Sequence, residues 1–237
     1  MTDIELYDKF LAMKNSGGVG IHVFKNPDII YLHLSKCAGT TIYKTLVSAC
    51  QEVPLDIKEI SENFDKYFSF TVIRNTYSKV LSEYNHEINS NLHTMNLDEW
   101  LESVCNRKRI DGRAGCFADY SNEYNELDQK SFCVMNDEDY LSYVGRFENL
   151  DEVFSVLNDK AGGNLNFPVL NPTNYRKREM SAEQVELIEE RFKEDIEYFG
   201  FTNDWEMKNP CLFMLSARDY LLKKCLTWID QNYNKRY

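Results

Sequence analysis

Short apolar runs alternate with segments of helical period in the first third of the chain. Residues 29–34 form a short, apolar run rich in β-forming residues, which predicts a buried strand. Directly after this run, apolar residues recur with the period of a helix, at positions Ile42, Leu46, Val47 and Cys50. We therefore expect a strand, a tight turn and a helix in that order, with Thr40 or Thr41 as the N-cap of the helix.

The same order returns further along the chain. Residues 68–74 form a second strand-like run, and a helical pattern follows it with apolar residues at Val80, Leu81, Tyr84 and Ile88. Residues 141–147 predict another strand. Strands that alternate with helices favour an α/β fold, in which a parallel sheet carries helices on both faces.

Helical patterns also occur at both ends of the chain. Residues 3–14 are typical of a short amphipathic helix that ends in a glycine-rich turn at Gly17, Gly18 and Gly20. Ser181 and Gln184 form a capping box, which predicts the start of a helix that ends at Gly200. The apolar face of that helix consists of Val185, Ile188, Phe192, Ile196 and Phe199. Residues 213–237 predict a last amphipathic helix.

Nothing in the sequence divides the chain into separate domains. It contains no internal repeat, no low-complexity tract and no long linker rich in proline, glycine or serine. We predict one domain over residues 1–237, with a core at about 29–201 and a C-terminal helical extension over 205–237. The acidic and aromatic middle, residues 89–138, has no clear period, and we expect helices and loops there.

The charge balance limits the classes of partner. A formal net charge of −11 works against sequence-independent binding to nucleic acid or to an anionic membrane surface, so we predict neither partner. Any anion site on such an acidic protein must be a local concentration of positive charge and backbone N–H groups. A short basic motif is therefore more informative here than it is in a basic protein.

Cysteine usage and the N-terminal residues indicate a compartment. The seven cysteines are an odd number, are widely spaced, and form neither a CxxC motif nor a metal-ligand spacing, so we predict a reduced environment and no metal site. The first ten residues carry acids and no apolar run, and no stretch approaches the ~20 apolar residues that span a bilayer. We expect a cytoplasmic protein.

The first motif with chemical content is residues 35–41, Ser-Lys-Cys-Ala-Gly-Thr-Thr, between the predicted strand and helix. The small residues Ala38 and Gly39 let the backbone curl closely around an anion, and the helix N-terminus offers unpaired N–H groups. Lys36 adds a full positive charge, and two threonines add hydroxyl donors. These features predict an anion-binding loop; the alternative is an ordinary strand-to-helix turn with a threonine cap.

This loop does not fit the nucleotide P-loop pattern, GxxxxGK[ST]. In that pattern the lysine follows the last glycine, whereas Lys36 precedes Gly39. The strand over residues 68–73 runs into Arg74 rather than into an aspartate placed to hold Mg²⁺. A kinase needs a metal to screen a triphosphate, whereas a donor whose transferred group carries one negative charge needs it less.

Arg74 is the second candidate for binding an anion. An arginine at the carboxyl end of a parallel strand lies at the rim where open α/β sheets bind ligands, and its fork can hold a phosphate in a bidentate manner. Ser78 and Ser82 follow on one face of the predicted helix, four residues apart, so that a hydroxyl can join Arg74 at the same group. A solvated arginine with two surface serines is the alternative.

Together these segments resemble the PAPS-dependent sulfotransferases, in the branch of the carbohydrate sulfotransferases (PAPS is 3′-phosphoadenosine 5′-phosphosulfate). Residues 31–41 are similar to the 5′-phosphosulfate loop of the family, a strand followed by H-I-P-K-x-G/A-G-T-S/T, and residues 71–84 to its 3′-phosphate segment, V-R-N/D-P-x-x-R-x-x-S-x-Y. Residues 144–150 and 174–201 resemble two later blocks, so the resemblance covers about 29–201 in the right order. Ser35 and Thr76 stand where the family usually has proline.

The resemblance implies a P-loop-like three-layer fold with a central parallel sheet flanked by helices, and a sulfotransferase that releases PAP, adenosine 3′,5′-bisphosphate, without a metal. It implies that the 5′-phosphate is held by Lys36, Cys37, Ala38, Gly39, Thr40 and Thr41. Lys36 would also stabilise charge on the bridging oxygen as its bond to sulfur breaks. Arg74 and Ser82 would hold the 3′-phosphate.

The general base is open among several residues. The acceptor hydroxyl must lose its proton, which a histidine or a carboxylate normally takes. We select His86, because it lies four residues after Ser82 on the same predicted helix; His93, Asp56 and Glu59 are the alternatives. His33 aligns with a histidine that the family carries in its strand and is interpreted as structural, and His22 lies outside the resemblance.

Three functions remain at this point. The first is a sulfotransferase that acts on a hydroxyl, or less often an amine, of a small molecule or sugar. The second is a kinase of small metabolites or another P-loop-like phosphotransferase, and the third is a non-catalytic nucleotide-binding protein of the same fold. The basic cluster at residues 176–178 is expected to close over the nucleotide, to meet an anionic acceptor, or to be a solvated loop, and neither the acceptor nor the oligomeric state can be predicted.

Overall fold

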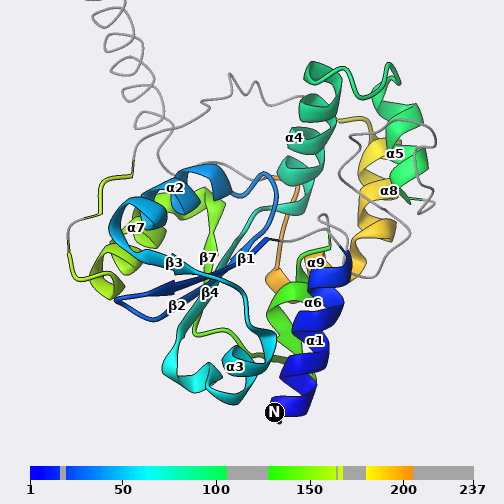
Figure 1. Ribbon diagram of the computed structural model, residues 1–237. Helices are drawn as coiled ribbons and strands as arrows, with labels where there is room; N and C mark the ends of the chain where they lie inside the picture. Colours follow the sequence, from blue (N-terminus) through cyan, green and yellow to red (C-terminus); the bar gives the residue numbers. More distant parts are fainter. Residues whose placement is uncertain (17–19, 106–127, 164, 168–179, 205–237) are drawn as a thin grey trace, which may run out of the picture.

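The structure, a computed structural model, describes residues 1–16, 20–105, 128–163, 165–167 and 180–204 (Figure 1). The strands in these residues are β1 (Gly20–Lys25), β2 (Ile29–His33), β3 (Gln51–Val53), β4 (Phe68–Ile73), β5 (Val134–Met135), β6 (Glu138–Asp139) and β7 (Tyr143–Arg146). The α-helices are α1 (Asp3–Ser16), α2 (Gly39–Ala49), α3 (Ile57–Glu62), α4 (Thr76–Asn89), α5 (Leu97–Cys105), α6 (Lys130–Cys133), α7 (Leu150–Lys160), α8 (Ala182–Arg191) and α9 (Lys193–Phe199). Two short 3₁₀ helices are η1 (Phe64–Lys66) and η2 (Phe147–Asn149).

The main sheet has five strands in the order β3-β1-β2-β4-β7. β2, β4 and β7 are parallel, whereas β1 is antiparallel to both β2 and β3. The predicted α/β class is therefore confirmed, but the sheet is mixed rather than wholly parallel. The cause of the difference is β1, which the sequence pattern did not reveal and which forms a hairpin with β2.

Helices cover both sides of this sheet. Figure 1 shows α2 and α7 on one side and α3 with α1 on the other. On the α2 side, aromatic rings form a ladder across the strands, with Tyr31 of β2 stacked on Phe70 of β4 at 4.7 Å between centroids. His22 of β1 continues the ladder and contacts Tyr43 of α2 at 4.4 Å. Such cross-strand pairs fix the register of the strands, and with it the edge at which each strand ends.

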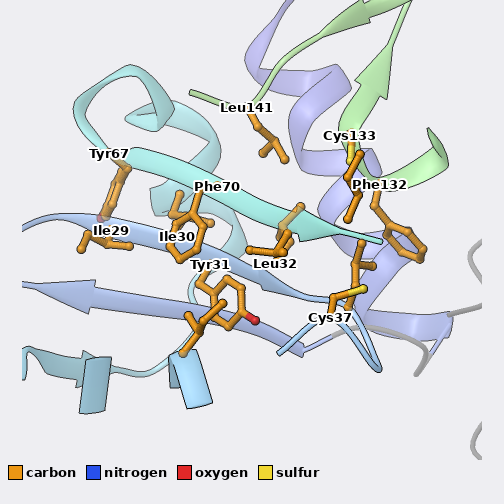
Figure 2. Packing of buried hydrophobic residues seen from close by; sticks show 14 of the residues in the cluster. Ile29, Ile30, Tyr31, Leu32, Cys37, Tyr67, Phe70, Phe132, Cys133 and Leu141 are labelled. Atoms are coloured by element: carbon orange, nitrogen blue, oxygen red, sulfur yellow. The ribbon is translucent and has the colours of Figure 1, made fainter. Parts of the chain in front are cut away.

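The buried hydrophobic residues form two clusters. The larger one joins the sheet to the surrounding helices, and Phe10 and Met13 of α1 are fully buried in it, so the core begins before residue 29. Cys37, which follows β2, belongs to the same cluster as Phe132 and Cys133 (Figure 2). The second cluster gathers α4, α5 and α8 around the fully buried Trp100.

Several boundaries differ from those that the sequence predicts. The helix expected from Ser181 to Gly200 consists of α8 and α9, because the backbone leaves helical geometry at Phe192 (φ −110°, ψ 26°). The capping box of Ser181 and Gln184 and the left-handed Gly200 are both present. The predicted helix at residues 213–237 and the extension at 205–237 lie outside the described residues. None of the helices that the structure describes combines the length and apolar character needed to cross a bilayer.

Candidate functional site

The turn after β2 has an uncommon backbone conformation. Lys36 and Ala38 both adopt left-handed geometry, with φ of 57° and 62°. For residues other than glycine this conformation costs about 1 to 2 kcal/mol each, so it persists only where neighbouring contacts enforce it. Left-handed residues at alternate positions turn successive backbone N–H groups toward one side. This arrangement is typical of concave anion-binding sites.

The N-terminus of α2 has no side-chain cap. Ala38 is the N-cap residue, and neither Thr40 nor Thr41 caps the helix, so the predicted threonine cap is wrong. The physical reason is that the turn is tighter than expected: helix α2 begins at Gly39, before either threonine. No acidic residue occupies the first turn, and the N-terminus of α2 therefore keeps its positive dipole end and its first N–H groups for another acceptor.

Gly39 is in direct contact with His33, the last residue of β2. A Cβ atom at position 39 would lie 1.8 Å from Nε2 of His33, so only glycine fits between the helix and the ring. Burial, and next the neighbouring His22, lower the pKa of His33 to about 4, which leaves its imidazole neutral at physiological pH. The loop of residues 35–41, which we call the anion loop, thus packs at Gly39 against an uncharged ring.

Arg74 joins the loop to α4 and β7. Its Nε donates to Oγ of Ser78 at 2.7 Å, and its Nη1 donates to the carbonyl oxygen of Lys36 at 2.9 Å. The guanidinium also lies over the ring of Phe147 at 4.1 Å, and the side chain is only 5% exposed. Two of its donors are therefore committed to positioning, and one of them holds the left-handed Lys36.

A buried amide fixes the backbone of Arg74. Gln129 Oε1 accepts from the Arg74 N–H at 2.7 Å, and Gln129 Nε2 donates to the Arg74 carbonyl at 2.8 Å. Asp195 in turn accepts from the backbone N–H groups of Gln129 and Lys130, at 2.8 and 2.7 Å. Burial raises the pKa of Asp195 to about 6, against these two hydrogen bonds, which lower it. A chain of contacts thus runs from α9 to the anion loop.

The thiol of Cys37 is buried beside this contact. Cys37 is fully buried and its Sγ lies 3.9 Å from Gln129 Oε1. Burial raises its pKa to about 12, although the charges of Lys79 and Arg74 act in the opposite direction. Cys37 therefore offers an anion only its backbone N–H group.

One face of α4 buries charged side chains that sequence reasoning missed. Lys79 is fully buried and Glu83 is 2% exposed, one helical turn apart. Oγ of Ser35 donates to Oε2 of Glu83 at 3.1 Å, which ties the start of the loop to α4. The i, i+4 spacing that pointed to Ser78 and Ser82 applies equally to Lys79 and Glu83, and the buried side chain of Ser82 lies on the same helix.

Three of the blocks that carry the family resemblance meet at the carboxyl ends of β2, β4 and β7. The loop after β2 contacts Arg74 after β4, and Arg74 contacts Phe147 after β7. Glu148 accepts from the backbone N–H of Asn75 at 2.8 Å. The basic cluster at residues 176–178 lies outside the described residues.

The candidate bases lie in different places. His86 is half-buried in the last turns of α4, three residues beyond Glu83. His93 is 4% exposed on a loop; its Nδ1 accepts from the Met95 N–H at 3.2 Å, so its proton is on Nε2, which lies 3.1 Å from Oε2 of Glu87 without hydrogen-bond geometry. His93 is therefore built into the helical cluster.

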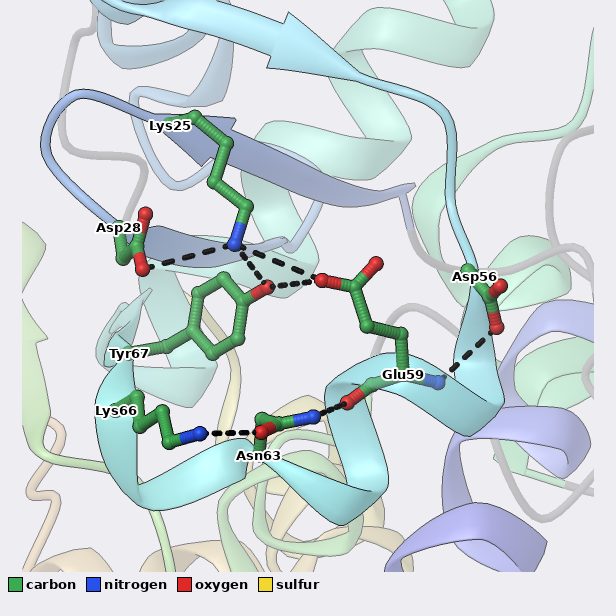
Figure 3. Close-up of polar contacts among 7 residues, drawn as sticks. All are labelled: Lys25, Asp28, Asp56, Glu59, Asn63, Lys66 and Tyr67. Carbon is green, nitrogen blue, oxygen red and sulfur yellow. Dashed lines mark hydrogen bonds and ion pairs between the residues drawn. The ribbon is translucent and has the colours of Figure 1, made fainter.

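Asp56 and Glu59 belong to another polar cluster (Figure 3). Asp56 caps α3 by accepting from the Glu59 N–H at 3.0 Å, and Glu59 lies 3.7 Å from Nζ of Lys25 and 3.3 Å from the hydroxyl of Tyr67. Tyr67 precedes β4, so this cluster lies at the amino end of the parallel strands. Five residues of β2 separate the two edges, about 13 Å, which places both carboxyl groups away from Lys36.

A pocket of about 340 Å³ lies elsewhere, between α1, α6 and the start of α9. Lys9, Lys130 and Arg191 line it together with four acidic residues. Its cations are engaged, because Lys9 donates to two backbone carbonyls and Arg191 forms a bidentate pair with Asp128. Asp195 lines the pocket and also supports Gln129 and thereby Arg74. We place the candidate site at the loop, where no side chain caps the N-terminus of α2.

Comparison with family models, with curated proteins and with solved structures gave no match for this chain.

Proposed function

We propose that this chain transfers a sulfuryl group from PAPS to a hydroxyl, or an amine, of a small-molecule or sugar acceptor and releases PAP. The observation that carries the proposal is the uncapped N-terminus of α2, preceded by left-handed Lys36 and Ala38, at the carboxyl end of a parallel strand. Such an N-terminus favours a phosphate or sulfate group, because the helix dipole and the N–H groups act on it together.

In this proposal the protein promotes the transfer by stabilising the leaving phosphate. The N–H groups at the start of α2 and the ammonium group of Lys36 stabilise the negative charge that develops on the bridging oxygen as the bond to sulfur breaks. Arg74 is a positioning residue for this step, since it holds the Lys36 carbonyl, and with Ser82 it borders the place that the resemblance assigns to the 3′-phosphate. Because Arg74 already donates to Ser78 and Lys36, its part in phosphate binding rests on its charge and on the position that these contacts give Lys36.

Local charge makes this site selective within an acidic protein. Lys36, Arg74 and Lys79 lie around the loop, while Glu83 and Glu148 accept hydrogen bonds nearby. The cations outnumber these two carboxylates by one. The local surplus opposes the net charge of −11 and favours a compact dianion over an extended polyanion.

Calorimetric titration with PAP, and with ATP plus Mg²⁺, tests the proposal. We expect PAP to bind and ATP with Mg²⁺ to bind more weakly; tight ATP binding without PAP binding would favour a kinase and overturn the proposal. Lys36→Ala should weaken PAP binding by about 1.5 to 3 kcal/mol, the range for a hydrogen bond to a charged group. Lys58→Ala is the matched control, since Lys58 is an exposed lysine on α3.

A further inference from the structure

A histidine and a glutamate form a hydrogen-bonded pair on the α2 side of the sheet. Nδ1 of His22 on β1 lies 2.9 Å from Oε1 of Glu52 on β3, and the hydroxyl of Tyr43 donates to Oε2 of the same carboxylate at 3.0 Å. A carboxylate only accepts hydrogen bonds, so Nδ1 carries the proton and Nε2 is the basic nitrogen. A carboxylate on one ring nitrogen thus orients the other as a proton acceptor.

The basic nitrogen of this pair faces the edge of the sheet at which the loop after β2 begins. In the antiparallel pairing of β1 with β2, Gly20 is opposite His33 and His22 is opposite Tyr31. The ring of His33 contacts Gly39, the first residue of α2, and the ring of His22 lies 5.7 Å from that of His33. His22 also contacts Tyr43, one helical turn after Gly39, so the two imidazoles lie side by side under the first turns of α2.

The basic nitrogen of His22 lies directly beside Gly20. A Cβ atom at Gly20 would come within 2.7 Å of His22 Nε2, and the side chain of His22 is 20% exposed. β3 pairs with β1 only from Val23 onward, so in the described part of the sheet the edge beside Gly20 and His22 has no β3 partner. An acceptor would reach Nε2 from this edge.

We propose that His22 is the general base of the sulfuryl transfer and that Glu52 is its positioning residue. The inference rests on the proposed function. In the step, a lone pair of the acceptor oxygen forms the bond to sulfur while its proton passes to His22 Nε2. The bond between sulfur and the bridging oxygen breaks, and this oxygen keeps the electron pair and leaves on PAP. Glu52 stabilises the resulting imidazolium, which later loses its proton to water.

The other groups around His22 are consistent with a single site of protonation. They are His33 and Tyr31 on β2, Tyr43 on α2 and Glu52 on β3. Burial keeps His33 neutral, and Glu52 is the only carboxylate among these contacts. A proton taken from the acceptor therefore stays on His22, beside its counter-ion, rather than moving to His33.

The test measures PAP affinity and turnover separately in the full chain. The probes are PAP for binding, and PAPS labelled in its sulfuryl group with phenol or water, both protonated near neutral pH, as acceptor. We expect His22→Asn to keep the PAP dissociation constant within about two-fold and to lower kcat by about 100-fold or more, the contribution of a general base. Glu52→Gln keeps the fold at an exposed position and should lower kcat roughly ten-fold.

Two further readouts separate catalysis from structure. Added imidazole should restore part of the turnover of His22→Ala. The loss of turnover should be at least about ten-fold larger for His22→Asn than for His86→Asn, the competing candidate.

The outcomes distinguish this inference from the proposed function. A wild-type chain that does not bind PAP overturns both. Binding and transfer in the wild-type chain, with a kcat of His22→Asn within about three-fold of it, would overturn the role of His22 and leave the sulfotransferase proposal standing. PAP binding without transfer of the label to either acceptor also overturns the role of His22.

Discussion

Replacement of Gly39 by alanine tests the contact between the anion loop and the sheet. The added methyl group would lie 1.8 Å from Nε2 and 2.0 Å from Cδ2 of His33, well inside van der Waals contact. His33 is held by stacking on Tyr31, at 5.5 Å between centroids, so the helix start must shift instead. We expect Gly39→Ala to lower the free energy of unfolding by about 2 to 3 kcal/mol, typical of overpacking a buried site.

The same shift should weaken anion binding, because the first N–H groups of α2 move with Gly39. We expect the PAP dissociation constant to rise at least about ten-fold, the loss of one charge-assisted hydrogen bond. Urea denaturation and calorimetric titration measure the two effects. The reasoning is refuted if Gly39→Ala binds PAP and unfolds like the parent chain.

A double-mutant cycle isolates the cause. All three of the closest atoms to the added methyl group belong to the ring of His33, so His33→Ala removes the clash. In that background we expect Gly39→Ala to change the free energy of unfolding by less than about 0.5 kcal/mol, which gives a coupling energy of about 2 kcal/mol between the two positions. A coupling energy near zero would show that Gly39 matters for another reason.

Three further predictions concern Arg74, Asp195 and the net charge of the chain. Arg74→Lys keeps the charge but loses the planar fork that reaches Ser78 and the Lys36 carbonyl, so PAP affinity should fall about ten-fold; unchanged affinity in calorimetry would remove Arg74 from the site. Asp195 has a folded-state pKa of about 6, above its ordinary value of 3.8, so it stabilises the fold fully below pH 3.8 and this contribution is lost as pH rises through about 6. The difference in unfolding free energy between the parent chain and Asp195→Asn should therefore change by about 2 kcal/mol between pH 4 and 6 in urea titrations, and a constant difference would contradict the assigned burial effect. At low salt a cationic acceptor should turn over faster than a sulfated one, because the net charge of −11 repels the latter, and the reverse preference would refute this.

The parts of the fold that were predictable are those with strong local signals. The strands β2 and β4, the helices that follow them and the capping box of α8 have clear hydrophobic periods or caps. β1 was missed because Gly17, Gly18 and Gly20 favour a turn, whereas the hairpin with β2 recruits Gly20 into the sheet. The threonine cap of α2 was wrong because sequence patterns do not report that Lys36 and Ala38 take left-handed geometry.

The candidate site was predictable where its residues stand close together in the sequence. The residues of the loop and Arg74 stand in two short motifs, and their order along the chain indicated that they would meet. The support from Gln129 and Asp195 could not be predicted, because these residues are about 55 and 120 positions from Arg74 and meet it only through tertiary packing. For the same reason nothing in the sequence links His22 with Glu52, which approach each other through the pairing of β1 with β3.

The most direct measurement of the central claim is a crystal structure of the chain with PAP. We predict that its 5′-phosphate lies at the N-terminus of α2, within hydrogen-bond distance of the N–H groups of Gly39 and Thr40 and of Nζ of Lys36. PAP bound at any other place, such as the pocket beside Lys9 and Arg191, would contradict the claim.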